Sequence, residues 1–300
     1  MDLPRLLLTA MRPRQWLKNG LVFLPLIFSV GEAWRPTDPG LWLPLAAEAM
    51  LAALAFCLVS SAGYLVNDLR DVERDRHHPR KRLRPLASGA LDTGVATAAV
   101  PVLLLGGGAL ASLVGWRFGA VLAAYALLTF LYSSVLKHVP TVDLFALALG
   151  FVLRAVAGGV AIDVRISPWL YLCTLLGALF IAITKRRHEL ASLGEGAAAH
   201  RPILAHYSVP LLDQMTSVVT ASTVMAYALY TVTAPNLPSS GAMVATVPFV
   251  LYGIFRYMYL VHQRDAGGSP EEVLLQDRSL QVSVLLWGAT AVTILLLARA

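Results

Sequence analysis

The sequence predicts an all-α polytopic membrane protein, a bundle of nine transmembrane helices with a cytoplasmic N-terminus. Three observations predict this fold. Of the 300 residues, 57% are hydrophobic and only 14% are charged, whereas a soluble domain carries roughly 25% charged residues. Apolar runs long enough to span a bilayer recur from one end of the chain to the other. The basic residues between these runs favour every second loop.

Each expected helix is an apolar run bounded by loop residues. The first is the weakest, because Pro25 interrupts it. Prolines, glycines and charges mark the breaks, as at 34–40, 115–117 and 235–241. The expected spans, in order, are about 18–33, 43–66, 94–114, 119–136, 141–162, 168–185, 210–233, 243–262 and 280–298.

The basic residues support this count. With the N-terminus inside, the inner segments hold 19 of the 24 Lys and Arg residues, and the outer segments hold four. Arg154 falls within a span. The positive-inside bias therefore accounts for the net charge of +6 without a nucleic-acid partner.

The two long inside loops, about 67–93 and 186–209, begin with charged residues directly at a helix end. The outside loops are short and carry little chemistry. We therefore expect one membrane domain over residues 1–300, whose active site faces the cytoplasm and is capped by these two loops.

An acidic motif opens the first inside loop. Asp68, Asp71 and Asp75 fall at i, i+3 and i+7, with Asn67 four residues before Asp71, so they are expected on one helix face. Stacked carboxylates repel unless a cation neutralises them, and Mg²⁺ prefers oxygen ligands together with substrate phosphate. The motif predicts a Mg²⁺-diphosphate site at the membrane surface. The alternative is a solvated helix end balanced by Arg70 and Arg74.

A basic segment follows the acidic motif. Lys81, Arg82 and Arg84 could bind phosphate oxygens. Taken one residue at a time, topogenic charge on an inside loop explains them equally well.

The motif Asn67-Asp-x-x-Asp71-x-x-x-Asp75 after the second helix resembles the first aspartate-rich motif of the UbiA superfamily of intramembrane prenyltransferases. Four further segments resemble its decaprenyl-phosphate phosphoribosyltransferase branch, and the resemblance covers nearly the whole chain. These segments are 12–19 (RPRQWLKN), 78–85 (HPRKRLRP), 153–159 (LRAVAGG) and 185–190 (KRRHEL).

The sequence departs from the prenyltransferase pattern in the second inside loop. Members of the superfamily typically carry a second aspartate-rich motif there, whereas this chain has Lys185, Arg186 and Arg187 with a single acid, Glu189. A basic wall suits a second anion, such as a lipid phosphate, better than a neutral aromatic acceptor. Positive-inside bias is the alternative explanation for the basic residues. Glu189 could pair with Lys185 or complete a metal shell.

Five further polar residues are candidates for the same site, and a sixth is a candidate cap. Arg154 lies inside an apolar helix, where an unpaired charge is costly, so it is a candidate for phosphate or acid pairing. Lys18 and Asn19 match the N-terminal segment of the branch. Arg256 and Arg278 flank the last inside loop and could reach the cavity, and Asp277 is expected to cap a helix.

The resemblance implies transfer of 5-phosphoribose from phosphoribosyl diphosphate to a polyprenyl (decaprenyl) phosphate, with release of diphosphate, for cell-wall arabinan precursors. It implies an integral protein of the bacterial inner membrane, and a homo-oligomer is left open. The implied roles divide by substrate. Mg²⁺ is assigned to Asn67, Asp71 and Asp75 with support from Asp68; the donor phosphates to Lys81, Arg82 and Arg84; and the lipid phosphate to Lys185, Arg186 and Arg154.

Two other functions remain open. One is a prenyl-diphosphate-dependent aromatic prenyltransferase, which needs Mg²⁺ at both inside loops. The other is a transporter or lipid-binding membrane protein without chemistry, a class that gives no reason for the acidic motif.

Overall fold

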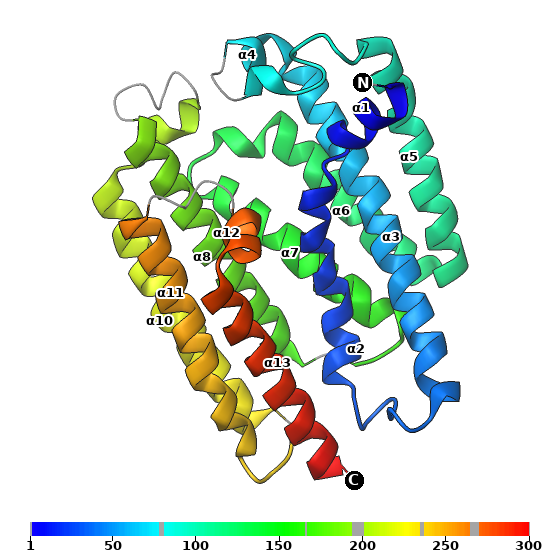
Figure 1. The fold of residues 1–300 in the computed structure, drawn as a ribbon, viewed down its shortest axis with the longest axis vertical. Coiled ribbons are helices and arrows are strands. Elements are labelled where there is room, and N and C mark those ends of the chain that lie inside the picture. The colour runs from blue at the N-terminus through cyan, green and yellow to red at the C-terminus, as the bar shows by residue number, and fades with distance from the viewer. Residues whose placement is uncertain are drawn as a thin grey trace.

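A computed structural model describes residues 2–77, 81–165, 167–193, 201–234, 237–264 and 270–299. Throughout these residues the fold is a helical bundle without named strands (Figure 1). Within this described part of the chain, eight helices are long and apolar enough to cross a membrane. They are α3 (Pro39–Arg70), α5 (Thr93–Val114), α6 (Trp116–Ser134), α7 (Val142–Ala161), α8 (Pro168–Leu193), α10 (Val209–Thr233), α11 (Val247–Gln263) with the preceding turn η6 (Ala242–Thr246), and α13 (Arg278–Arg299).

The first predicted span differs from the other eight. Residues 18–33 do not form one regular α-helix; the chain adopts a 3₁₀ helix, η1 (Pro13–Phe23), followed by the short helix α2 (Leu24–Phe28). The segment nevertheless runs along the bundle beside α3 (Figure 1). Pro25 lies at the junction, where a proline lacks the N–H that a continuous helix needs.

Side-chain caps explain where several helices begin. Asp38 accepts a hydrogen bond from the Gly40 N–H at 3.0 Å at the start of α3. Asp92 accepts one from the Gly94 N–H at 2.8 Å at the start of α5. Asp277 does the same for the Leu280 N–H at 2.8 Å before α13, which confirms its predicted role as a cap. Each cap satisfies a backbone donor that has no partner within the helix.

Close packing brings η1 against α7 in the middle of the bundle. A Cβ atom placed on Gly158 would lie 2.1 Å from the carbonyl oxygen of Val22, so only glycine fits this contact. Val22 and the neighbouring Ala157 are fully buried in a cluster that also holds Phe56 of α3. The irregular first segment is therefore fixed to the bundle by its backbone as well as by its side chains.

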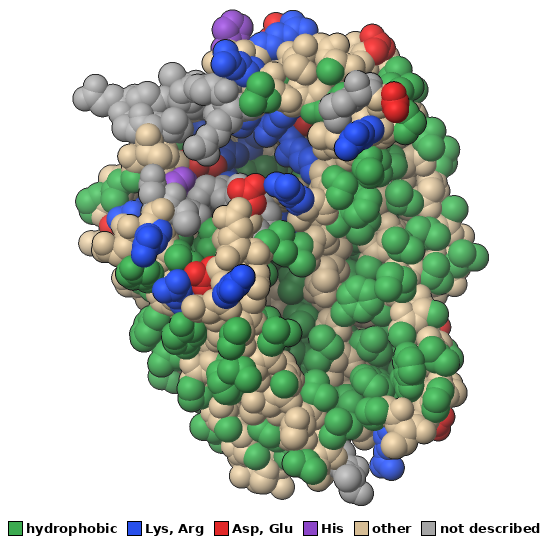
Figure 2. Space-filling model, viewed as in Figure 1, with side chains coloured by type: hydrophobic (Ala, Val, Ile, Leu, Met, Phe, Trp, Pro, Cys, Tyr) green, Lys and Arg blue, Asp and Glu red, His purple; other side chains and the backbone are tan. Residues whose placement is uncertain are grey.

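Charge is concentrated at one end of the molecule. Figure 2 shows Lys, Arg and acidic side chains around a hollow at the top of the view, above a surface that is mainly hydrophobic. The short elements at this end are α1 (Leu3–Ala10), α4 (Val72–Arg76), η2 (Lys81–Leu83), η3 (Leu136–His138), η5 (Pro202–His206) and α12 (Pro270–Gln276). The wide apolar surface is what a bundle exposes to lipid.

Candidate active site

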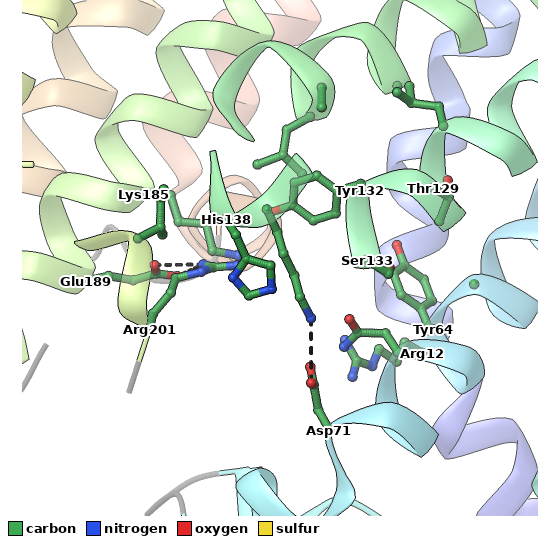
Figure 3. Close-up of a pocket in the computed structure, with 18 of the residues that line it drawn as sticks. Arg12, Tyr64, Asp71, Thr129, Tyr132, Ser133, His138, Lys185, Glu189 and Arg201 are labelled. Atoms are coloured by element: carbon green, nitrogen blue, oxygen red, sulfur yellow. Dashed lines mark hydrogen bonds and ion pairs between the residues drawn. The ribbon is translucent and has the colours of Figure 1, made fainter. Parts of the chain in front are cut away.

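A polar cavity of about 400 Å³ opens at the charged end of the bundle. The ends of α3, α6, α7 and α8 form its walls, and residues from both long loops complete it. Figure 3 shows Asp71 and Arg12 on one side of this hollow and Lys185, Glu189 and Arg201 on the other. Titratable groups of both signs therefore converge on one cavity, the usual arrangement of a site that acts on charged substrates.

The acidic motif spans a break between two helices. Helix α3 continues past the predicted end at residue 66 and stops at Arg70; Asp71 lies at the break, and α4 begins at Val72. The expectation of a single helical face was therefore wrong. The break still turns Asn67, Asp71 and Asp75 toward the cavity, because all three line it.

Asp68 has a different role from the one predicted. Its side chain is 3% exposed and does not line the cavity. It forms an ion pair with Arg12 and another with Arg84 at 3.0 Å. The carboxylate thus ties the N-terminal segment and the first long loop to the end of α3.

Arg84 and Lys81 connect the first long loop to the acidic motif. Arg84 also forms an ion pair with Asp75, and Lys81 Nζ lies 3.8 Å from Asp75 Oδ1. Burial lowers the pKa of the Lys81 ammonium; the Asp75 carboxylate opposes this shift, and the nearby Arg84 and Arg201 cations add to it. Lys81 and Arg84 line the cavity as predicted, whereas Arg82 lies outside its lining.

Asp71 is the carboxylate best placed for a metal. It is partly exposed and lines the cavity, with Lys137 Nζ and Arg74 NH1 each 3.6 Å from its Oδ1 atom. The dashed line at Asp71 in Figure 3 marks its contact with the lysine. Two cations thus balance the charge of this carboxylate.

The donor set fits Mg²⁺ only in partnership with a substrate. Within the described residues, no group of three or more His, Cys, Asp or Glu side chains is arranged to hold a metal by itself. Mg²⁺ usually takes one or two carboxylates and completes its shell with waters and phosphate oxygens. Asn67, Asp71 and Asp75 supply such a partial set at the cavity wall.

Lys185, Glu189 and Arg201 form the opposite wall. Glu189 accepts a hydrogen bond from Arg201 NH1 at 2.9 Å and one from Arg186 NH1 at 3.1 Å. It therefore holds two arginines in place, and Lys185 also acts electrostatically on this carboxylate.

Arg186 does not line the cavity, contrary to its predicted contact with the lipid phosphate. It is 1% exposed, and its Nε donates to Asp143 Oδ2 at 3.0 Å while its NH2 donates to the Tyr132 hydroxyl at 3.2 Å. A buried guanidinium needs such partners, because an unpaired buried charge is strongly destabilising. Arg186 therefore acts through its hydrogen bond to Glu189, which does line the cavity.

Arg154 lies at the inner end of the cavity and is 5% exposed. It donates from Nε to Asn19 Oδ1 at 2.8 Å, from NH1 to the Gly150 carbonyl at 2.7 Å and from NH2 to the Tyr125 hydroxyl at 2.7 Å. Its centre is also 4.6 Å from the Tyr125 ring centroid, in a cation–π contact. All these partners are neutral. The positive charge of the Arg154 guanidinium therefore remains available to an anion in the cavity.

A second cavity, of about 450 Å³ and mainly apolar, adjoins the polar one. Its walls come from η1, α2, α8, α10 and α13, and include Phe28, Tyr227 and Trp287. Lys18 and Lys185 line both cavities. The two ammonium groups therefore stand at the boundary between the polar and the apolar space, where an anionic lipid headgroup would meet its tail.

Arg256 and Arg278, two further predicted binding residues, also lie outside both cavities. Arg256 donates from NH2 to Asp277 Oδ2 at 2.7 Å, and this hydrogen bond holds the pKa of the Asp277 carboxyl below its usual value. Arg278 begins α13 and lines neither cavity. The ion pair with Asp277, the residue that precedes α13, holds Arg256 away from the polar cavity.

Sequence reasoning missed several residues of the polar cavity. Lys137 and His138 lie in the short segment η3 after α6, Arg12 directly precedes η1, and Arg201 directly precedes η5. The sequence predicts an inside location for all four. Nothing local distinguishes them from topogenic charge, because their partners are distant along the chain.

The helical bundle, the charged cavity at its membrane-surface end and the apolar cavity beneath it define a membrane-embedded transferase. The chain belongs to the UbiA prenyltransferase family, whose family model matches residues 23–275. The family assignment confirms the resemblance drawn from the acidic motif.

Relatives that match almost the whole chain carry the name of the phosphoribosyltransferase branch. The chain is 35% identical to the decaprenyl-phosphate phosphoribosyltransferase of Mycolicibacterium smegmatis over 300 residues, covering 95% of this chain and 90% of that protein. It is 34% identical to the Mycobacterium tuberculosis protein of the same name, covering 94% and 91%. A 4-hydroxybenzoate octaprenyltransferase of Methylococcus capsulatus is 30% identical over only 51% of this chain.

Solved structures share the fold. A UbiA homologue from Archaeoglobus fulgidus, bound to GPP and Mg²⁺, superposes with a TM-score of 0.72 at 18% identity and covers 97% of this chain and 99% of that one. The same homologue bound to DMAPP and Mg²⁺ also gives a TM-score of 0.72. At this identity the likeness establishes the architecture alone.

Proposed function

We propose that this protein transfers 5-phosphoribose from phosphoribosyl diphosphate to a polyprenyl phosphate such as decaprenyl phosphate, releasing diphosphate. One observation carries the proposal. A polar cavity rich in cations shares Lys18 and Lys185 with an apolar cavity, so a phosphorylated lipid and a water-soluble phosphorylated donor can meet at one boundary. The names of the relatives that match almost the whole chain support the same reaction.

The reaction needs no proton acceptor on the nucleophile. An ionised oxygen of the lipid phosphate attacks the anomeric carbon of the donor, and the bond from that carbon to diphosphate breaks with its electron pair leaving on diphosphate. Positive charge develops on the sugar during this step, as in other glycosyl transfers. Arg154 and Lys185 would hold the lipid phosphate next to this carbon, and Arg84 would bind the leaving group.

Asn67, Asp71 and Asp75 would hold Mg²⁺ together with diphosphate oxygens. When bound there, the metal stabilises the negative charge that develops on the leaving group. Mg²⁺ in the Archaeoglobus fulgidus homologue supports this assignment by family analogy. Lys137, whose Nζ lies 3.6 Å from Asp71 Oδ1, would also bind the diphosphate.

The size of the apolar cavity indicates how the lipid is bound. A volume of about 450 Å³ is that of a pocket for a drug-sized molecule. A long polyprenyl chain therefore has only its first units inside, and the rest remains in the bilayer, where burying each CH₂ is worth about 0.8 kcal/mol.

The proposal includes one domain over residues 1–300, with the cavity facing the cytoplasm of a bacterial plasma membrane. Lys81 and Arg84 of the first long loop, and Glu189 and Arg201 of the second, line the cavity, which supports their role as a cap. Residues 78–80 and 194–200 of these loops lie outside the described part of the chain. The excess of Lys and Arg at this end supports the orientation.

Purified protein in detergent with Mg²⁺ would be given labelled phosphoribosyl diphosphate and decaprenyl phosphate. We expect labelled ribose in the lipid phase, and none with Asp71→Ala. In a parallel reaction, a prenyl diphosphate and an aromatic acid would be supplied. Prenylation of the acid without ribose transfer would replace the proposal with the aromatic prenyltransferase reaction.

A further inference from the structure

Asn19 is buried between two helices instead of lining a cavity. The sequence predicts that it contacts substrate, but it is 2% exposed and lines neither cavity. Its side-chain oxygen accepts a hydrogen bond from Arg154 Nε of α7 at 2.8 Å, and its nitrogen donates to Cys57 Sγ of α3 at 3.2 Å. Asn19 therefore reaches the polar cavity through Arg154, which does line it.

The 3₁₀ geometry of η1 directs Asn19 into the bundle. In a 3₁₀ helix, side chains three residues apart lie in one row, whereas in an α-helix each such step turns the side chain by about 60° around the axis. Trp16, Asn19 and Val22 form one row of η1. Trp16 Nε1 donates to Ser61 Oγ of α3 at 3.1 Å, and the Val22 backbone packs against Gly158 of α7. The row that fixes η1 to α3 and α7 thus also brings Asn19 to Arg154.

Arg154 is a buried cation whose hydrogen-bond partners are all uncharged. Within the part of the chain that the structure describes, it is bonded to the Asn19 amide, the Gly150 carbonyl and the Tyr125 hydroxyl, and to no carboxylate. Arg186 of α8 is also buried, but it forms an ion pair with Asp143 at 3.0 Å. A buried charge without a counter-charge is strongly destabilising. The arginine that faces the cavity therefore keeps a charge that the structural arginine has neutralised.

The Arg154 guanidinium also keeps donors for a ligand. Arginine carries five N–H groups, and the bonds to described residues use one each on Nε, NH1 and NH2. One further N–H on NH1 and one on NH2 remain, and such a pair suits two oxygens of a phosphate. The Phe151 ring centroid is 5.6 Å from the guanidinium carbon, and Phe151 lines both the polar and the apolar cavity. This position corresponds to the headgroup of a lipid.

We infer that Asn19 is a positioning residue for the lipid phosphate: its uncharged amide orients the Arg154 guanidinium without neutralising it. The inference rests on the proposed function and adds the requirement that residue 19 be neutral. A carboxylate at this position has nearly the same shape and accepts the same hydrogen bond, but it forms an ion pair with Arg154 and competes with the phosphate. The absence of charge on Asn19 is therefore as important for acceptor binding as its hydrogen bond.

Asn19→Asp tests this requirement in the full-length protein in detergent. The probes are farnesyl phosphate and farnesol, which share one isoprenoid chain and differ in the phosphate. We expect the farnesyl phosphate Kd to rise by about tenfold, the loss of one charge-assisted contact, and the farnesol Kd to stay unchanged. The melting temperature should not fall, because the buried cation gains a counter-charge. Gln263→Glu, at the exposed end of α11, makes the same change of charge and should bind both probes normally.

Asn19→Ala distinguishes positioning from direct contact with the phosphate. It removes the hydrogen bond to Arg154 without adding charge, so we expect a smaller, selective loss of farnesyl phosphate affinity than Arg154→Met causes. In the Arg154→Met background, Asn19→Ala should have no further effect, because both changes act on one contact. Additive losses would instead show that Asn19 binds the phosphate itself.

Three outcomes overturn the inference. They are an Asn19→Asp protein that binds farnesyl phosphate as tightly as the wild type, an Asn19→Asp protein that loses both probes equally, and additive effects of Asn19→Ala and Arg154→Met. If Asn19→Ala fails to fold, the Asn19→Asp comparison alone decides, because the carboxylate retains the hydrogen bond. Failure of the proposed function is seen separately, as absence of lipid-linked ribose from a wild-type protein that binds farnesyl phosphate.

Discussion

Lys137 Nζ lies 3.6 Å from Asp71 Oδ1, so the carboxylate proposed to bind Mg²⁺ faces a lysine from a different loop. The pair joins the break after α3 to the short segment η3. A cation in this position offsets the charge of Asp71 before substrate arrives, and it is close enough to bind the diphosphate afterwards. The relationship leads to the first prediction.

Asp71→Ala should abolish transfer and leave the protein folded, because Asp71 is partly exposed and lies at a helix break. Lys137→Gln should behave differently: it should lower the Mg²⁺ concentration needed for half-maximal activity, since the competing cation is gone, and also lower kcat. Both would be measured by titrating Mg²⁺ in the transfer assay. A higher Mg²⁺ requirement in Lys137→Gln would contradict the competition.

Asp68→Asn should reduce stability more than it affects the Mg²⁺ requirement. The buried carboxylate neutralises Arg12 and Arg84, each about a quarter exposed. Breaking a fully buried pair costs about 3–5 kcal/mol, and partial solvation of both arginines reduces the expected loss to about 2 kcal/mol. Thermal unfolding in detergent would measure it. Glu73→Gln, at an exposed ion pair, is the control and should change little.

Arg154→Met should abolish transfer, while Arg256→Gln should retain it. Arg154 faces the cavity and is held by Asn19 and Tyr125. Arg256 was predicted from sequence to reach the same site but is bonded to Asp277. Initial rates at saturating substrates would compare the two. If both variants lost activity without unfolding, the position of Arg256 outside the site would be wrong.

Lys185→Gln should raise KM for the lipid phosphate by about tenfold, the value of one charge-assisted contact. The KM for phosphoribosyl diphosphate should stay near the wild-type value, because Lys185 lies at the boundary with the apolar cavity. Lys18→Gln should act in the same direction. Steady-state kinetics with each substrate varied separately would show the split, and an increase confined to the donor KM would reverse the assignment.

Short-range patterns in the sequence determined the membrane class, eight of the expected spans and the location of the acidic motif. The hydrophobic length of α3, α5 and the other helices is a local property, and so is the acidic spacing that places Asn67, Asp71 and Asp75 at one helix end. The structure of the first segment, η1, could not be predicted in the same way. Its backbone packs directly against Gly158 of α7, a contact that its own sequence does not reveal.

Only the tertiary structure decided which charged groups serve the cavity and which serve the fold. Asp68 is separated from Arg12 by 56 positions, Asp143 from Arg186 by 43, and Asn19 from Arg154 by 135. In the sequence, Arg12 and Arg186 share the inside bias of the cavity cations and look like them. Burial distinguishes the structural charges from the cavity charges. A charged side chain buried inside the bundle must have a partner, whereas one that faces the cavity is available to a phosphate.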